Sequence, residues 1–248
     1  MSLKGSVNLL IDALLSVIYP QRCDLCPNLV HARSDGTTCA TCWEDIELGG
    51  IAGTICSKCG SPALGQVPLE RADQVRCRRC DQDEFTAARA CGVYEGALRS
   101  AVLRLKREPY VCERVIKMLI EIQAGEPLNR ASMIIPVPLH DERRRVRGFN
   151  QAEVIADALS NACHLPVNTA TLLRTVHTER HRAGMDAKAR RDSVVHAFAV
   201  IHPRVVEAER ILLVDDVFTT GATSSSAAGA LKEAGASEVF VLTLARAR

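Results

Sequence analysis

The feature of this sequence that most constrains its fold is a short apolar run that ends in two acids and a small, hydroxyl-rich turn. The run covers residues 211–214, and Asp215 and Asp216 follow it directly. Branched apolar residues without alternation are typical of a strand buried on both faces, as in a parallel sheet. Residues 224–234 then carry small and apolar side chains at helical spacing, and Gly235 is placed to end a helix there. The order of strand, acids, turn and helix predicts an α/β fold with a parallel sheet.

The turn between the acids and the helix has the composition of an anion-binding loop. Its residues are Thr219, Thr220, Gly221, Ala222 and Thr223. The start of a helix offers unpaired backbone N–H groups and a positive dipole end, and the threonine hydroxyls add donors. The two preceding carboxylates only accept hydrogen bonds, which suits a pair of neighbouring sugar hydroxyls. We therefore expect a ribose 5-phosphate group at this turn, although two acids can also simply cap a strand before a solvated turn.

These residues resemble a known ligand site. Residues 214–223, Val-Asp-Asp-Val-Phe-Thr-Thr-Gly-Ala-Thr, are similar to the loop that binds phosphoribosyl pyrophosphate (PRPP) in type I phosphoribosyltransferases. Nearly the whole chain resembles the ComF family of competence-associated proteins. The resemblance implies a type I phosphoribosyltransferase-like parallel sheet with helices on both faces. It also implies that Asp215 and Asp216 are catalytic residues that orient the ribose, that residues 219–223 hold its 5′-phosphate, and that Mg²⁺ enters with PRPP.

The ComF resemblance further implies a role in DNA uptake during natural transformation, with single-stranded DNA and a competence helicase as partners. Two classes of function stay open, because a fold alone does not define an activity. One is an enzyme that transfers ribose phosphate from PRPP to an unknown acceptor. The other is a non-enzymatic module that senses PRPP and binds single-stranded DNA or a partner protein. A net charge of +2 and an aromatic content of 4% give no separate indication of a base-stacking surface.

Four Cys-x-x-Cys pairs define the first third of the chain. They comprise eight of the eleven cysteines: Cys23, Cys26, Cys39, Cys42, Cys56, Cys59, Cys77 and Cys80. In a chain of 248 residues this spacing is typical of metal binding rather than of an extracellular disulfide framework. Two pairs supply the four thiolates of a tetrahedral zinc site, and the polar sequence between them has too few apolar residues to fold by burial alone. We expect two closed, structural Zn²⁺ sites in which consecutive pairs share an ion, with crossed pairing as the alternative. This segment resembles the double zinc ribbon of ComF proteins.

The sequence predicts three segments: an N-terminal amphipathic helix at 1–19, the double zinc ribbon at 20–85 and a phosphoribosyltransferase-like domain at 86–248. The apolar stretch within the first segment is interrupted by Asp12 and is too short to span a bilayer. We therefore expect no membrane insertion and, without an export signal, a cytoplasmic protein. The three cysteines outside the pairs are expected to be small core residues: Cys91, Cys112 and Cys163.

A second strand is expected at residues 133–137, ahead of a loop rich in proline and arginine. In the fold that the resemblance implies, this loop binds pyrophosphate, and its residues are Val137, Pro138, Leu139, His140 and Arg147. Arg147 opens the run Arg-Gly-Phe-Asn-Gln, which matches a ComF signature, and a guanidinium beside a helix start suits a phosphate group. Asn150 and Glu153 predict the N-terminus of the helix that follows. Three neighbouring arginines stay open between ligand, solvent and the DNA backbone: Arg143, Arg144 and Arg145.

Periodicity assigns the remaining elements. Helices are expected at 97–106 and 112–122, and strands at 193–201 and 238–244. Residues 174–191 are polar and aperiodic, as expected for a mobile loop that excludes water from a reactive sugar. In that region His181 and Ser193 depart from the ComF pattern, which has Gln and Asn there.

Overall fold

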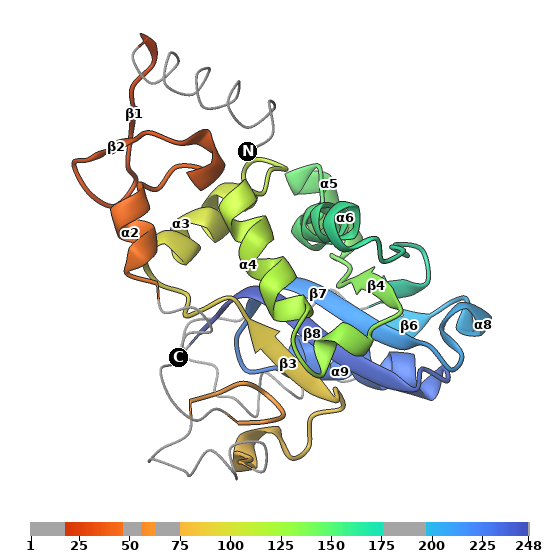
Figure 1. Ribbon diagram of the computed structural model, residues 1–248. Helices are drawn as coiled ribbons and strands as arrows, with labels where there is room; N and C mark the ends of the chain where they lie inside the picture. The colour runs from red at the N-terminus through yellow and green to blue at the C-terminus, as the bar shows by residue number, and fades with distance from the viewer. Residues whose placement is uncertain (1–17, 47–55, 63–74, 176–196, 248) are drawn as a thin grey trace.

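The computed structural model of the protein describes residues 18–46, 56–62, 75–175 and 197–247. At its centre is a four-stranded parallel sheet (Figure 1). In spatial order the strands are β3 (Ala87–Ala90), β8 (Glu238–Arg246), β7 (Arg210–Phe218) and β4 (Met133–Pro136). Of the two central strands, β8 is buried along nearly its whole length and β7 is buried from Ile211 to Val214 and at Phe218, because a neighbouring strand lies on each side and helices cover each face. The predicted parallel α/β fold is confirmed.

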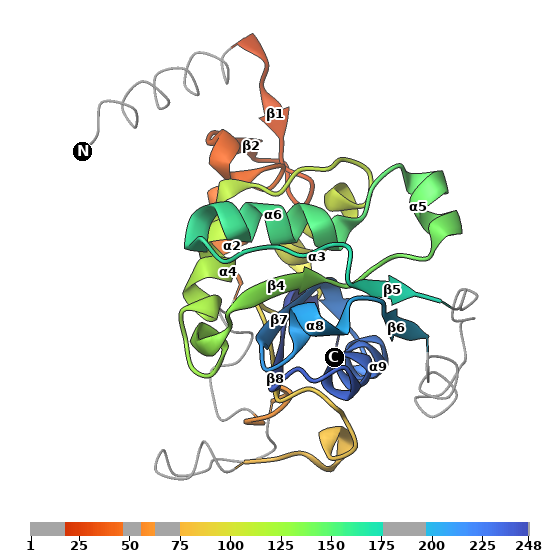
Figure 2. The ribbon, with the colours of Figure 1, turned by 90° about the vertical axis from the view of Figure 1, so that its right-hand side faces the viewer.

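Helices cover both faces of this sheet (Figure 2). On one face lie α3 (Gly96–Leu105), α4 (Glu113–Gln123) and α6 (Gln151–Cys163), and on the other lies α9 (Ala222–Glu233). Successive side chains of a strand point to opposite faces, so β7 contributes to two cores. Leu212 and Val214 pack with α3, α4 and α6, whereas Leu213 packs with α9.

Several short elements surround the sheet. β5 (Leu172–Arg174) and β6 (Phe198–Val200) form an antiparallel pair. The others are β1 (Gln21–Arg22), β2 (Leu29–Val30), α2 (Ala40–Glu44), α5 (Asp141–Arg147), α8 (Pro203–Val206) and 3₁₀ turns at Arg33–Asp35, Arg78–Cys80 and Leu128–Arg130. Among the described residues, no helix is both long and apolar enough to span a bilayer.

Two short segments hold the paired cysteines. The first ribbon, residues 21–46, lies against α3 and α4. The second ribbon, described at residues 56–62 and 75–85, lies against β3, β8 and the start of α9. The sheet separates the two ribbons, as Figure 2 shows.

Three expectations about boundaries are wrong. The acids do not end their strand, since β7 continues through them to Phe218, where it still pairs with Arg246 of β8. α9 begins at Ala222, two residues before the predicted start, because Gly221 serves as its N-cap. The loop after β4 is not irregular throughout, since it contains helix α5.

Other expectations are confirmed or lie outside the described residues. Asn150 caps α6 by accepting a hydrogen bond from the amide of Ala152, as predicted. The last expected strand is β8, and the strand expected at 193–201 is β6, described from Phe198. The N-terminal helix expected before Ile18 and most of the loop expected at 174–191 lie outside the described residues, as do His181 and Ser193.

Candidate functional site

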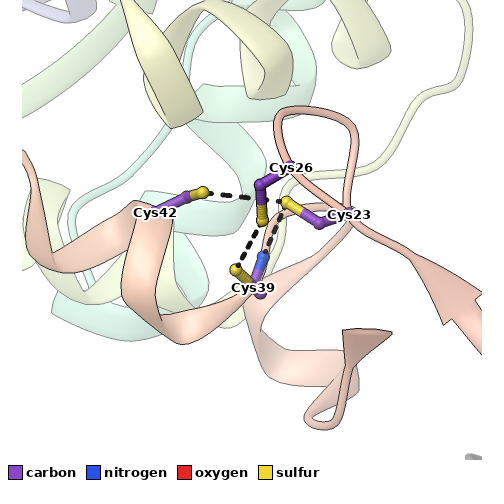
Figure 3. A group of neighbouring side chains, drawn as sticks. All are labelled: Cys23, Cys26, Cys39 and Cys42. Atoms are coloured by element: carbon purple, nitrogen blue, oxygen red, sulfur yellow. Dashed lines mark hydrogen bonds between the residues drawn. The ribbon is translucent and has the colours of Figure 1, made fainter. Parts of the chain in front are cut away.

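The eight paired cysteines form two clusters, each from two consecutive Cys-x-x-Cys pairs. In each cluster the four Sγ atoms lie within 4.8 Å of one another; Figure 3 shows the first, with Cys23, Cys26, Cys39 and Cys42 converging from two turns. A tetrahedral site with Zn–S bonds of about 2.3 Å has sulfur–sulfur edges of about 3.8 Å. The Sγ atoms of Cys26 and Cys39 are 3.6 Å apart. Both clusters therefore fit one tetrahedral ion each, with the sequential pairing expected.

The second cluster has the same geometry and the same backbone support as the first. The Sγ–Sγ distances are 3.5 Å for Cys56–Cys80 and 3.5 Å for Cys59–Cys77. The amide of Cys77 donates to Cys56 Sγ at 3.3 Å. Burial opposes ionisation of the Cys56 thiol, yet hydrogen bonds from surrounding amides outweigh burial and lower its pKa to about 6. A thiol with a lowered pKa is prepared to bind zinc, which takes the thiolate.

The acid pair of β7 lies at the carboxyl edge of the sheet. Asp215 still pairs with Thr243 of β8, and its Oδ1 accepts a hydrogen bond from the Asp216 amide at 2.8 Å. Asp216 Oδ2 is 3.4 Å from Nζ of Lys106, the residue that caps the end of α3. The sequence does not single out Lys106, because its pairing with Asp216 bridges more than a hundred residues of chain.

The two carboxyl groups differ in their ease of ionisation. Burial raises the pKa of Asp215, and the negative charge of Asp216 raises it further, to about 8, against the opposing charges of Arg174 and Lys106. At neutral pH Asp215 therefore keeps its proton for most of the time. A cation or a hydroxyl-bearing ligand that reaches this pair would favour its ionised form.

The turn after β7, residues 219–223, has the features of an anion-binding helix start. Gly221 has φ of +83° and, as N-cap of α9, brings no side chain to occupy the first amides of the helix. Thr219 is exposed and Thr223 half-buried. Thr220 is also half-buried, and its Oγ1 accepts from the Ala222 amide at 3.4 Å. Ala222 and Thr223 lie in the first turn of α9, where the backbone N–H groups have no acceptor within the helix itself.

The loop after β4 leaves the sheet beside the acids of β7. The amide of Val137 donates to the Val214 carbonyl at 2.8 Å, which extends the pairing of the two strands by one residue. Asn150 Nδ2 donates to the Val137 carbonyl at 3.0 Å and ties the loop to the start of α6. Pro138 and Leu139 are half-buried, and His140 caps α5 by accepting from the Glu142 amide. The predicted pyrophosphate loop and the acid pair thus lie at one edge of the sheet.

The four arginines that precede α6 lie on helix α5, and they differ in their surroundings. Arg143 and Arg147 are half-buried, four residues apart on one side of the helix. Burial lowers the pKa of Arg147, with Asp216 acting against this and Arg143 adding to it, so the three charges lie close together. Arg144 instead forms a two-pronged ion pair with Glu153, at 2.7 and 3.1 Å, and Arg145 is exposed.

One further cation and one amide face the same region. Arg174, at the end of β5, lies with its guanidinium 5.5 Å from the Phe198 ring centroid. Burial and the charge of Arg143 lower the pKa of Arg174, while Asp215 raises it. Gln151, the first residue of α6, is 3% exposed, and its Nε2 has no acceptor within the described part of the chain. Of Arg174 and Gln151, the sequence singles out only Gln151, which is the last residue of the ComF signature.

Comparison with known proteins places this arrangement. Residues 14–81 match the double zinc ribbon domain. Competence protein F of Haemophilus influenzae is 29% identical over 91% of this chain and 97% of that protein. The DNA utilization protein YhgH of Salmonella typhimurium is 28% identical over 92% and 97%, and competence protein ComFC of Bacillus subtilis is 27% identical over 86% of each.

Among solved structures, two enzymes are similar to part of this chain. A glutamine PRPP amidotransferase from B. subtilis has a TM-score of 0.38 at 22% identity, covering 58% of this chain, which spans 30% of that enzyme. The adenine phosphoribosyltransferase of Leishmania tarentolae has a TM-score of 0.34 at 14% identity, covering 60% and 74%.

The chain is thus a double zinc ribbon joined to a parallel α/β domain whose carboxyl edge carries an acid pair and a helix start. Over most of its length it is similar to competence protein F, ComFC and YhgH.

Proposed function

We propose that the protein binds PRPP at the edge of the sheet where β7 turns into α9. In this proposal the turn at 219–223 holds the 5′-phosphate, and Asp215 and Asp216 accept from the ribose hydroxyls. Val137, Pro138, Leu139 and His140, with Arg147 from α5, surround the diphosphate. The observation that carries the proposal is the order of groups along one edge: the acid pair, then an N-cap without a side chain, then the first amides of helix α9.

The charges around the acids support a polyanionic ligand. Lys106 lies 3.4 Å from Asp216, and the charge of Arg143 lowers the pKa values of both Arg147 and Arg174. Partly buried cations that repel one another are stabilised by an anion between them. Mg²⁺ that entered with PRPP would neutralise part of the diphosphate charge, and Asp215 and Asp216 are the carboxylates of this edge that could help to hold it.

We propose that catalysis, where it occurs, is a transfer of ribose phosphate to an acceptor. The residues of this chain then contribute positioning and electrostatics: the acids fix the ribose and favour positive charge at its C1′, and Arg147 stabilises the leaving pyrophosphate. The relatives carry the names competence and DNA utilization proteins, which supports a role in DNA uptake with single-stranded DNA and a competence helicase as partners.

Calorimetric titration with PRPP and Mg²⁺ tests the binding proposal. We expect Asp216→Asn and Arg147→Ala each to weaken binding about tenfold or more, since each removes a charged hydrogen-bonding group. Arg145→Ala, on the exposed side of the same helix, is the matched control and should change affinity less than twofold. The proposal is contradicted if the parent protein gives no heat of binding with PRPP and Mg²⁺, or if the two arginine substitutions weaken binding equally.

Pyrophosphate release separates the two classes of function. Turnover of PRPP in the presence of a base or single-stranded DNA, abolished by Asp216→Asn, identifies a transferase. Tight binding without turnover identifies a PRPP-sensing adaptor. For the DNA partner, Arg145→Ala should lower the salt dependence of single-stranded DNA binding by about one phosphate contact; an unchanged slope removes α5 from that interface.

A further inference from the structure

The last residue of β8, Arg246, connects the second ribbon to the strand that carries the proposed site. Its Nη1 donates to the Cys59 carbonyl at 2.8 Å, and its Nη2 donates to Ser61 Oγ at 2.8 Å. Its guanidinium also lies 5.4 Å from the ring centroid of Phe218, the residue before the 219–223 turn. Arg246 is 8% exposed. One buried side chain therefore contacts both the cysteine turn and the residue that begins the ligand turn.

The Phe218 ring packs against the 219–223 turn at Gly221. The alternation of β7 reverses near its end: Leu212 and Val214 face α3 and α4, but Phe218 belongs to the core that contains α9 and the second ribbon. The Phe218 ring meets that of Phe85 edge-on, with centroids 5.8 Å apart. A Cβ added to Gly221 would lie 2.9 Å from Phe218 Cζ. The position of the ring thus determines where the N-cap of α9 can lie.

The chain that leaves the second ribbon reaches the other side of the same turn. The Asp83 amide donates to the Cys80 carbonyl at 3.2 Å, and Lys58 Nζ donates to the Asp83 carbonyl at 2.6 Å. Asp83 Oδ2 would be 3.4 Å from a Cβ at Gly221. The next residue, Glu84, donates its amide to Ser225 Oγ in the first turn of α9 at 3.0 Å.

The charge of a metal site adds to these contacts. A zinc ion with four thiolates carries two negative charges in total. Arg246 is buried beside this cluster, and Arg89 Nη2 donates to the Ser57 carbonyl at 3.0 Å. A buried guanidinium is stable only while an opposite charge and acceptors accompany it. Loss of zinc would change the charge beside Arg246 and release the Cys59 carbonyl from its fixed position.

We propose that Arg246 is a positioning residue that holds the 219–223 turn in its ligand-binding form only while zinc occupies Cys56, Cys59, Cys77 and Cys80. This coupling rests on the proposed function, because it concerns the site assigned to PRPP. It is reciprocal: zinc in the second ribbon strengthens binding at the turn, and a ligand at the turn slows the release of that zinc. The first ribbon contacts α3 and α4 instead, so its zinc is not coupled to the turn.

The test measures the rate at which the full-length, zinc-loaded protein releases each zinc ion to a chromogenic chelator, with and without PRPP and Mg²⁺. We expect PRPP to slow release of one ion about tenfold, within the usual range of coupling, and to leave the other within twofold. Cys23→Ser with Cys26→Ser, which empties the first ribbon, should keep the protected ion. Slowing of both ions equally, or of neither while PRPP binds, overturns the proposal.

Arg246→Met tests the residue itself without removing a zinc ligand. We expect two bound zinc ions and protection by PRPP of less than twofold, whereas Arg114→Met at the first ribbon keeps the tenfold protection. If Arg246→Met does not fold, hydrogen exchange of the 219–223 amides tests the proposal instead. It is measured in the parent protein without ligand, before and after zinc is removed by a chelator. We expect these amides to lose protection when the second ribbon is emptied; unchanged exchange overturns the coupling even if PRPP binding itself holds. Failure of PRPP to bind, with zinc-dependent exchange intact, refutes only the proposed function.

Discussion

The two zinc ribbons share one ligand spacing but attach to opposite faces of the sheet. The first is anchored by Trp43, which is 4% exposed and joins the core under α3 and α4. Its cysteines form a separate small cluster with Val30. In the second ribbon the cysteines themselves belong to the core on the α9 face, together with Phe85 and Phe218. The first ribbon is thus joined to the domain by Trp43 and by polar contacts such as Ser100 to Asp24, whereas the cysteines of the second ribbon themselves lie in the core of the domain.

This difference teaches that a metal module's role depends on which of its atoms contact the rest of the fold. We expect an anchor that is a side chain, such as Trp43, to depend less on the metal than an anchor made of the cysteine turns themselves. Backbone carbonyls of a cysteine turn, such as that of Cys59 under Arg246, are fixed only while the turn is closed around its ion. The two ribbons can therefore serve as each other's control in one molecule.

The largest effect that distinguishes the ribbons should come from removing one buried ligand from each. Cys80 is 2% exposed and Cys39 is 4% exposed, so Cys80→Ala and Cys39→Ala are matched in burial and chemistry. Each should lower the zinc content from two ions per chain to one. We expect Cys80→Ala to lower the free energy of unfolding of the α/β domain by about 4 kcal/mol or more, since it combines metal loss with a disrupted core.

Calorimetry measures this contrast directly. Cys39→Ala should leave the main unfolding transition of the domain nearly in place and remove a smaller, separate contribution. Equal losses in the two variants would mean that the ribbons are equivalent in the stability of the fold.

The aromatic anchors give the next largest contrast. Trp43→Ala and Phe218→Ala each empty a buried aromatic site, and each should cost about 3–5 kcal/mol of stability. We expect Phe218→Ala also to weaken PRPP binding about tenfold or more, because the ring supports Gly221, whereas Trp43→Ala should change it less than twofold. Titration calorimetry at a temperature where both variants are folded is the measurement. A large loss of affinity in Trp43→Ala would contradict the separation of the two faces.

An effect that depends on pH should come from titrating the acid pair, which lies on the strand that the second ribbon supports. The pKa of Asp215 is about 8 in the folded chain, above its value of about 3.9 when unfolded. Between these values the folded state holds a proton that the unfolded state releases, so this group makes the fold less stable as pH rises from about 4 to about 8. Asp215→Asn removes that dependence. Its melting temperature relative to the parent should therefore increase from pH 5 to pH 8 and level off above pH 9.

Thermal unfolding measured across this range gives the answer without any ligand. Ribbon zinc has to be kept saturated in both proteins, so that metal loss at low pH does not enter the difference. A constant difference between the two proteins across the range would show that Asp215 is ionised in the fold.

The parts of the structure that the sequence predicts well are those set by local chemistry. The strand at Ile211, the helix after Gly221 and the cysteine pairs are each specified within a few residues. The same local sequence brings the acids of β7 near the first amides of α9, because only a short turn separates the strand from the helix. Its assignment to PRPP stays a prediction.

The parts of the structure that the sequence does not predict depend on contacts between distant segments or on a helix without an apolar side. β3 consists of three alanines and an arginine, a poor strand sequence that forms between β8 and the second ribbon. α5 is almost entirely charged, so no hydrophobic period marks it, and His140 and Gly148 define its ends. Lys106, Arg174 and Arg246 reach the site or its support from elements far away in the chain, which no local pattern reveals.

The smallest predicted effect concerns the charge at the first ribbon's anchor. Arg114 lies 3.3 Å from Asp35 and 5.7 Å from the ring centroid of Trp43, in a half-exposed position where such contacts are weak. Arg114→Gln should therefore cost about 1 kcal/mol of stability and alter the fluorescence of Trp43, the single tryptophan of the chain. Release of zinc from the second ribbon and its protection by PRPP should stay as in the parent. Because Arg114 and Arg246 are both arginines stacked on an aromatic ring at a ribbon, a change in that protection would show that the coupling spreads through the sheet rather than through Arg246.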